Sequence, residues 1–386
     1  MRIVAMADLH LGFRRHPARI EGRNTREVDV EKAWAEAVEK AIDLAPDLVT
    51  IAGDVFHHPR VSMHAVKAFR DGLRMLSAHN IQVVVLEGNH DAAKTAEVLT
   101  PVIIPDDLEG VHTVHRPERL RIHTRDGSEI ANVACFPYVD RGDGYSYHLE
   151  PDQSADLNIL VMHAAVKGHA EGDTLPFFYG GDGKALDVGR VADDWDVVAC
   201  GDYHTFTRLH PTRPAFYSGS LERTSSNVWQ EDEEKGFVFI DTEEDRFDFI
   251  EVYTRPMRSF QLSELGESEV NADALNRAMG RLVDDVHLAD FMVRLKVDEF
   301  PRNERQHIDW GRVRLLKEEC LHFYLDLRYS KAEFVDIGDR RSRSGALSLA
   351  EEAVRFSRDS DPEAAALFLR YLGVEAEAEE LAKAAP

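Results

Sequence analysis

The sequence has few cysteines and no long apolar run, and each absence excludes a class of protein. Its three cysteines, Cys135, Cys200 and Cys320, are odd in number and form no CxxC pair. This excludes a disulfide framework and favours a reducing compartment, the cytoplasm. No apolar run is long enough to span a membrane. The N-terminus lacks the charged, apolar and small-residue regions of a signal peptide.

Positive charge is also scarce. The 386 residues include 46 Lys and Arg against 70 Asp and Glu, a formal net charge of −24. This charge repels nucleic acid on average and says nothing about the fold. It is unevenly spread, because residues 1–26 hold six arginines against two acids, whereas residues 229–251 hold ten acids against two bases. We interpret the acidic run as a solvated hairpin without a function, whereas the basic segment is the stronger candidate for a functional role.

Apolar periodicity predicts alternating strands and helices in the first part of the chain. Strands are expected at 2–7, 47–54 and 81–91, and amphipathic helices at 28–45 and 61–79. This alternation predicts βαβ units and a mainly parallel sheet. In such sheets, ligands bind beyond the carboxyl ends of the strands.

The remainder of the chain is expected to extend this domain and add two smaller parts. Further strands are predicted at 158–163 and 196–204, a glycine-rich loop at 165–190, and an antiparallel meander at 216–254. A small α/β module follows, with strands at 259–263, 291–298 and 321–328 and helices at 271–286 and 308–320. A linker at 336–345 precedes short helices within 347–384. The predicted domains are therefore 1–255, 256–335 and 336–386.

Polar side chains follow five of the predicted strands. They are Asp8 and His10, then Asp54, then Asn89 and His90, then His163, and finally Asp202 and His204. Oxygen and nitrogen donors without sulfur suit manganese, iron or magnesium better than a structural zinc. Seven donors, without His90, exceed the needs of one ion and fit two ions that share a carboxylate. Two such ions about 3.5–4 Å apart clamp the oxygens of an in-line phosphoryl displacement, so we expect phosphate-ester hydrolysis.

Each motif alone has a simpler explanation. A DxH pair occurs by chance, GNHD resembles a turn, and a single buried histidine such as His163 is more often a core residue than a ligand. The metal site is favoured because all the motifs fall in order at the ends of apolar strands of one α/β pattern.

The order D-x-H, G-D, G-N-H-D, H and G-x-x-H resembles the calcineurin-like metallophosphoesterase superfamily. "DLHLG", "GDVFHH" and "YSGSLERTS" followed by "KGFVFID" resemble SbcD-type nucleases of DNA double-strand-break repair, the meiotic-recombination-eleven type. The resemblance covers about residues 1–255. It implies a metallophosphoesterase-type α/β sandwich with a small α/β capping domain that binds DNA and a helical C-terminal tail.

The resemblance also implies roles for matching residues. The first metal would be held by Asp8, His10, Asp54 and His204, and the second by Asp54, Asn89, His163 and Asp202, with Asp54 bridging. His90 would donate a proton to the leaving oxygen or stabilise the phosphate, and Asp91 would orient it. His57 would contact the scissile phosphate.

One position departs from the family pattern. The pattern G-H-x-H is replaced by Gly201-Asp202-Tyr203-His204. Asp202 adds a third carboxylate, which is expected to tighten binding of hard cations and raise the pKa of the water between the metals. We expect an active site with a stronger preference for manganese or magnesium. Asp202 reaches its metal either directly or through water.

The expected function is that of a manganese-dependent DNA exonuclease and endonuclease in a repair or recombination complex. The arginines of 12–26 are read almost equally as DNA contacts or as a solvated loop. The resemblance further implies a homodimer through helices of the nuclease domain and an SbcC-type coiled-coil ATPase partner. The C-terminal helices either dock that ATPase or pack against the capping domain. Two alternatives stay open, namely a small-molecule phosphodiesterase with the same dimetal site and a non-catalytic DNA-bridging scaffold.

Overall fold

The computed structural model describes residues 1–92, 100–138, 150–167, 186–187, 192–225, 227–284 and 288–330. The predicted linker and C-terminal helices lie outside these residues, as does most of the predicted glycine-rich loop. One compact unit comprises Met1–Val297 with Asn303–Leu327. A second unit has its described part in Asp298–Arg302 and 328–330. Among the described helices, none is both long enough and apolar enough to cross a membrane.

The first six-stranded sheet has the order β16-β15-β1-β4-β5-β6. Its strands are β1 (Arg2–Met6), β4 (Leu48–Ile51), β5 (Gln82–Leu86), β6 (Val111–Val114), β15 (Gly236–Asp241) and β16 (Arg246–Glu251). β1, β4, β5 and β6 are parallel neighbours, as the βαβ pattern predicts, whereas β15 and β16 run antiparallel at the other edge. β1, β4 and β5 are almost entirely buried on both faces, and their sequences are mostly apolar runs.

The second six-stranded sheet has the order β13-β14-β12-β9-β8-β7. Its strands are β7 (Glu118–His123), β8 (Ile130–Phe136), β9 (Leu157–His163), β12 (Val197–Gly201), β13 (Thr207–Arg208) and β14 (Ala215–Tyr217). The predicted meander at 216–254 is correct for β15 and β16 but wrong at its start. β14 lies parallel to β12 in this second sheet, because Ala215 and Phe216 pair with Val198 and Ala199.

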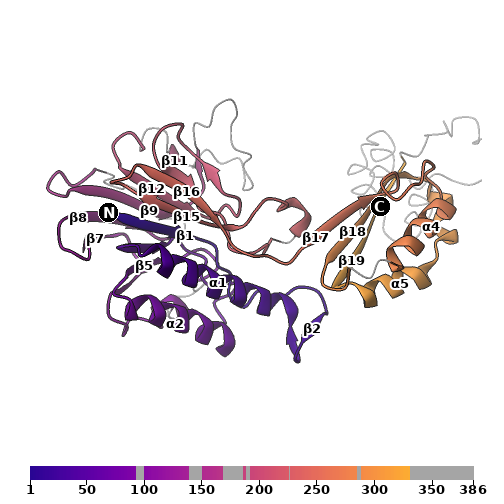
Figure 1. Ribbon diagram of the computed structural model, residues 1–386, viewed down its shortest axis with the longest axis horizontal. Coiled ribbons are helices and arrows are strands. Elements are labelled where there is room, and N and C mark those ends of the chain that lie inside the picture. Colours follow the sequence, from indigo (N-terminus) through magenta and orange to yellow (C-terminus); the bar gives the residue numbers. More distant parts are fainter. Residues whose placement is uncertain are drawn as a thin grey trace, which may run out of the picture. The chain divides into compact units, whose positions relative to one another are not determined.

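Two helices cover one face of the first sheet (Figure 1). α1 (Thr25–Leu44) begins at Asn24, whose side chain accepts a hydrogen bond from the Arg26 N–H, and α2 (Met63–Ala78) begins at Ser62. The indole of Trp34 in α1 donates to the Ala68 carbonyl in α2. A Cβ on Gly72 would lie 2.5 Å from the Trp34 Nε1 atom, so only glycine permits this close packing.

Alternation along each strand divides the core into layers. Val4 and Met6 of β1 pack with the two helices, whereas Ile3 and Ala5 face the second sheet. The two sheets thus share one apolar layer, and a further cluster around Trp195 covers the outer face of the second sheet. This layered arrangement is the predicted α/β sandwich.

The remaining elements are short or lie in the small module. Short pairs and 3-10 turns are β2 (Arg19–Ile20), β3 (Arg23–Asn24), β10 (Val166–Lys167), β11 (Leu186–Asp187), η1 (Pro101–Ile103), η3 (Val228–Gln230) and η5 (Arg302–His307). The module consists of β17 (Met257–Gln261), α4 (Ala272–Val283), β18 (Met292–Phe300), α5 (Trp310–Glu319) and β19 (His322–Tyr329). Each of its predicted strands and helices is present, and the strand order is β17-β18-β19. The domain boundaries stay predictions.

Candidate metal centre

The strand ends of both sheets bring the seven predicted donors together. Asp8 and His10 follow β1, Asp54 follows β4, and Asn89 follows β5; these come from the first sheet. His163 ends β9, and Asp202 and His204 follow β12, both in the second sheet. Since neighbouring parallel strands end at one edge, residues far apart in sequence meet there.

The first cluster of donors consists of Asp8, His10 and His204, whose ligand atoms lie within 4.8 Å of one another. The Nε2 atoms of His10 and His204 are 3.0 Å apart. Asp8 and His10 are buried, and His204 is partly buried. Two imidazole nitrogens and a carboxylate that converge at this distance form a suitable ligand set for a cation.

The second cluster consists of Asp8, Asp54 and His163. Asn89 adds its amide oxygen, which lies 2.8 Å from the His163 Nε2 atom. Asp202 lies close as well, with its Oδ1 atom 3.8 Å from the same nitrogen. The substituted position therefore brings a carboxylate to the second cluster.

Asp8 belongs to both clusters. Asp54, a member of the second, also lies close to His10 of the first. Its Oδ2 atom is 3.7 Å from the His10 Nε2 atom, and its Oδ1 atom is 3.5 Å from the His163 Nε2 atom. The backbone N–H of His90 donates to Oδ1 at 2.8 Å. Asp54 is thus placed to serve both clusters at once.

Hydrogen bonds at Nδ1 orient two of the imidazoles. The Nδ1 of His163 lies 2.8 Å from the Ala52 carbonyl and donates its proton there, so Nε2 is the atom that a metal would bind, in place of the proton that faces Asn89 Oδ1. The Nδ1 of His10 lies 3.3 Å from the Nδ1 of His57. Both rings therefore present Nε2 to the centre.

The charges of the site favour a bound cation. Burial raises the pKa of Asp8 to about 6. Burial lowers the pKa of His10 well below its ordinary value, and the neighbouring imidazoles add to that shift. Burial also opposes charge on His163, but Asp54 and Asp8 outweigh it and raise its pKa to about 9. Without a metal, the buried carboxylates stabilise a proton on the nearby imidazole. A divalent ion supplies positive charge in place of that proton, so the site favours divalent ions.

The backbone at these ligands is strained. Asp8, His10, Asp54 and Asp202 all have positive φ angles, of 52°, 48°, 51° and 104°. Such residues cost about 1–3 kcal/mol each and cluster at functional sites. The preceding glycines allow close approach, since a Cβ on Gly53 would lie 2.3 Å from the His163 Nδ1 atom and a Cβ on Gly88 would lie 2.1 Å from the Asp54 nitrogen.

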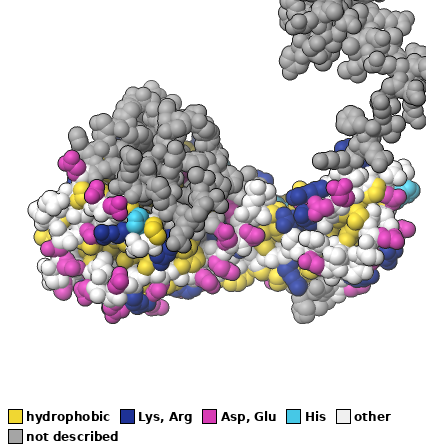
Figure 2. Space-filling model, turned by 90° about the horizontal axis from the view of Figure 1, so that it is seen from above, with side chains coloured by type: hydrophobic (Ala, Val, Ile, Leu, Met, Phe, Trp, Pro, Cys, Tyr) yellow, Lys and Arg dark blue, Asp and Glu magenta, His cyan; other side chains and the backbone are white. Residues whose placement is uncertain are grey.

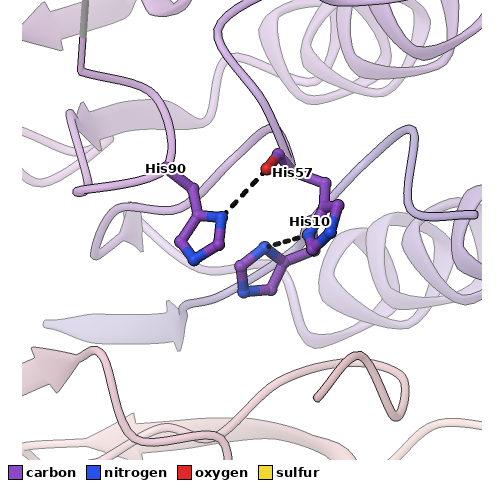
Figure 3. Close-up of side chains that lie close together, drawn as sticks. All are labelled: His10, His57 and His90. Atoms are coloured by element: carbon purple, nitrogen blue, oxygen red, sulfur yellow. Dashed lines mark hydrogen bonds between the residues drawn. The ribbon is translucent and has the colours of Figure 1, made fainter. Parts of the chain in front are cut away.

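His57 and His90 lie beside His10, one of the donors (Figure 3). The Nδ1 of His90 lies 2.9 Å from the His57 carbonyl oxygen, and the ring packs edge-on against His10 with centroids 4.8 Å apart. Burial, with the neighbouring His58 and His90, lowers the pKa of His57 to about 4. The two predicted catalytic imidazoles are therefore next to the donors.

Asp91 is fully buried behind the site. Its carboxylate accepts hydrogen bonds from the N–H groups of Val55 (3.0 Å), Phe56 (2.7 Å) and Gly88 (2.9 Å). Burial, followed by the charge of Asp54, raises its pKa to about 8. Asp91 thus joins the loops after β4 and β5. The ring of His90, which we expected Asp91 to orient, is held by the His57 carbonyl.

A buried carboxylate, that of Glu231, lies behind His204, where the sequence predicted none. Glu231 belongs to the acidic run read as a solvated hairpin, yet it is only 5% exposed, and Lys235 is only 1% exposed. Its Oε1 atom lies 3.5 Å from the His204 Nδ1 atom. Burial would raise the pKa of Glu231, but His204 and Lys235 outweigh it and hold the pKa below its ordinary range. Lys235, four residues after Glu231, is the sequence signal that could have indicated this buried carboxylate.

The basic segment at the N-terminus is largely paired with acids. The pairs are Arg14 with Glu27, Arg23 with Glu31, and Arg26 with both Asp29 and Glu222. Arg26 is completely buried. These three arginines hold α1 in place, which is a third explanation beside the DNA contacts and the solvated loop that we considered.

Comparisons with known proteins agree with this geometry. A family model described as calcineurin-like phosphoesterase matches residues 1–206. The chain is similar to the DNA double-strand break repair protein Mre11 of Methanopyrus kandleri, at 26% identity over 235 residues, 58% of this chain and 49% of that protein. It is also similar to the Mre11 proteins of Archaeoglobus fulgidus (26% over 296 residues, 68% and 62%) and Halobacterium salinarum (26% over 294 residues, 74% and 68%).

The matches cover only part of some relatives. The chain spans about half the length of the Methanopyrus protein and less than two thirds of the Archaeoglobus protein. The family model nevertheless covers more than half of this chain and ends just after His204, the last predicted donor. Together with the two-sheet sandwich, this confirms the predicted fold class. The chain belongs to the calcineurin-like phosphoesterase family.

Proposed function

We propose that the chain is a metal-dependent DNA nuclease of double-strand-break repair, with exonuclease and endonuclease activity. The observation that carries this proposal is the convergence of seven oxygen and nitrogen donors in two overlapping clusters. Similarity to the archaeal repair proteins supports DNA as the substrate.

The proposed cofactors are two divalent ions, manganese first and magnesium second. Asp8, His10, Asp54 and His204 would hold one ion, and Asp54, Asn89, His163 and Asp202 the other. When bound, such ions activate water and neutralise charge on a phosphodiester. Three carboxylates among the donors support a hard cation, because harder ions prefer oxygen ligands.

His57 and His90 have separate roles in the proposed reaction. If the His10 Nδ1 donates to the His57 Nδ1, the proton of neutral His57 lies on Nε2, where it can be donated to a phosphate oxygen. His90 donates from Nδ1 to the His57 carbonyl, so the proton available to the leaving oxygen is the one that the imidazolium form carries on Nε2; its transfer leaves the ring neutral. Asp91 keeps both loops in register through its three backbone hydrogen bonds.

The proposed partners are DNA, a second copy of the chain and an SbcC-type coiled-coil ATPase. The homodimer would form through helices of the nuclease domain, as the resemblance implies. The ATPase would be bound by the C-terminal helices, which lie outside the described residues. We propose the cytoplasm as the compartment, since the three cysteines are buried and unpaired.

The test is hydrolysis of an end-labelled duplex and a matched single strand, with manganese, magnesium or a chelator. The wild-type chain is compared with Asp202→His and with Asp194→His, which makes the same change at an exposed position outside the site. We expect metal-dependent cleavage by all three proteins, with an altered metal preference in Asp202→His alone. Failure of the wild type to cleave with any metal, together with recovery in Asp202→His, would contradict the proposal and favour a non-catalytic scaffold.

A further inference from the structure

The buried residues Glu231 and Lys235 have no role in the mechanism proposed above. Both belong to the acidic run 229–251, whose other acids next to them, Asp232, Glu233 and Glu234, are exposed. Burial of a carboxylate and an ammonium group is costly unless each is paired. The two groups pair with each other, and both also lie against His204.

The contacts of Glu231 fix its carboxylate in place. The Oε2 atom lies 2.7 Å from the Lys235 Nζ atom, and the Oε1 atom accepts a hydrogen bond from the Ser225 N–H at 2.7 Å. Lys235 also donates to the His204 carbonyl at 2.7 Å. One lysine thus binds both the carboxylate and the backbone of the histidine that the carboxylate faces.

The two nitrogens of His204 face different groups. Nδ1 faces Glu231 Oε1 at 3.5 Å and the Thr224 hydroxyl at 3.4 Å. Nε2 faces His10 Nε2 at 3.0 Å, inside the first donor cluster. A carboxylate at Nδ1 keeps the proton there and leaves the Nε2 lone pair for the metal. It also makes the imidazole a stronger ligand.

We infer that Glu231, held by Lys235, is a positioning residue that orients His204 and strengthens its binding of the first metal. This inference rests on the proposed function, because it concerns the same metal centre. Among the three ligand imidazoles, His163 has a backbone carbonyl at Nδ1 and His10 has His57. The Nδ1 of His163 also lies 3.9 Å from Asp8, which is itself a donor of the site, so His204 differs in having at Nδ1 a carboxylate from outside the donor set.

The first test is metal affinity, measured by titration calorimetry with Mn²⁺ and without DNA. Glu231→Ala is expected to weaken the site that contains His204 about 10- to 100-fold. Glu231→Gln, which retains an acceptor oxygen but loses the charge, should weaken it less. Glu234→Gln is the matched control on the exposed part of the same run and should leave both affinities unchanged. The site is identified as the one weakened by His10→Gln.

Two results would overturn the inference. One is a folded Glu231→Ala variant whose two affinities stay within about twofold of the wild type. The other is equal weakening of both sites, which would indicate a general structural role. Because this assay contains no DNA, a wild-type chain that binds two ions but cleaves no DNA refutes the proposed nuclease and leaves the inference intact.

A second measurement needs no variant at Glu231. In the wild-type chain with ¹⁵N-labelled histidine and Zn²⁺ as a diamagnetic probe, long-range ¹H–¹⁵N spectra report which nitrogen of His204 carries the proton. The resonance is assigned by its loss in His204→Gln. A proton on Nδ1 with Zn²⁺ at Nε2 supports the inference, and a proton on Nε2 overturns it, even where Glu231→Ala does not fold.

Discussion

At the scale of single residues, the proposed mechanism assigns metal binding and proton transfer to different groups. Asp54 faces both donor clusters, so its loss affects both. His90 lies beside them; its ring is held by the His57 carbonyl, and only its backbone N–H, which a substitution retains, bonds to Asp54. Its removal should therefore leave the donor clusters complete while the proton-transfer group is lost.

This separation predicts different results for two variants. His90→Asn should bind Mn²⁺ and DNA as the wild type does, because no donor is lost, yet cleavage should slow by about 10²–10⁴-fold, the usual contribution of a general acid or base. Asp54→Ala should lose both metal binding and cleavage. Titration calorimetry, DNA-binding assays and cleavage rates measured on the same preparations check both expectations.

The control for this comparison is His123→Asn, the same change at an exposed position on β7. It should leave binding and cleavage unchanged. Loss of folding in His90→Asn would show that His90 is structural, and substantial cleavage by Asp54→Ala would contradict a mechanism in which one carboxylate serves two metals.

At the scale of secondary-structure elements, the strand ends were predictable and the elements around them less so. Asp8, Asp54 and Asn89 follow strands that are buried on both faces, so their sequence reads as an apolar run that stops at polar residues. β14 has only three residues, too few for its period to show, and its sheet was assigned wrongly. Glu231 was missed because composition alone does not distinguish a carboxylate bound to a buried lysine from its exposed neighbours.

Another group of buried charges joins α1 to the segment between β16 and β17. Asp29 accepts a hydrogen bond from Arg26 at 2.8 Å and two from Arg255, at 2.8 and 2.6 Å. The Asp29 and Arg26 side chains are 6% and 0% exposed. One carboxylate thus pairs with two arginines, and Arg26 has Glu222 as a second partner. These contacts link the start of the helix to the chain that leads into the small module.

Asp29→Ala is expected to lower the free energy of unfolding by about 3–5 kcal/mol, because it removes a carboxylate from Arg255 and leaves the buried Arg26 with Glu222 as its remaining acidic partner. Urea denaturation followed by tryptophan fluorescence measures this loss. The matched control is Asp71→Ala, which removes a carboxylate from an exposed ion pair with Lys67 on α2 and should cost at most about 1 kcal/mol. Equal losses in the two variants would show that the Asp29 contacts add nothing beyond an ordinary surface pair.

At the scale of the whole molecule, the net charge of −24 has to be reconciled with a DNA substrate. Acidic side chains are spread over the face seen in Figure 2, with Lys and Arg among them. Pairing of Arg14, Arg23 and Arg26 with acids leaves less positive charge near the site than the sequence suggested. Metal ions at the donor clusters are therefore the main positive charge that we propose for binding a phosphate there.

The stability of the whole chain should also depend on pH through two stacked histidines, His16 and His322, whose ring centroids are 3.5 Å apart. Burial lowers the pKa of His16 to about 3, with His322 and then Arg26 and Arg15 adding to the shift. Burial also lowers the pKa of His322 to about 4, with Lys317 and Arg15 adding to that shift. Both rings are therefore neutral in the folded chain at pH values where an unfolded histidine already binds a proton.

Because the unfolded state takes up more protons, the contribution of this pair is fully present above about pH 6.5 and is lost as the pH falls toward 4 and then 3. We expect the free energy of unfolding in urea to decrease between pH 7 and pH 5. His322→Phe, which keeps an aromatic ring on β19 but cannot take up a proton, should make this decrease smaller. His123→Phe, at the exposed position on β7, should not. The same slope in His322→Phe and the wild type would show that the stacked pair does not contribute to the pH dependence.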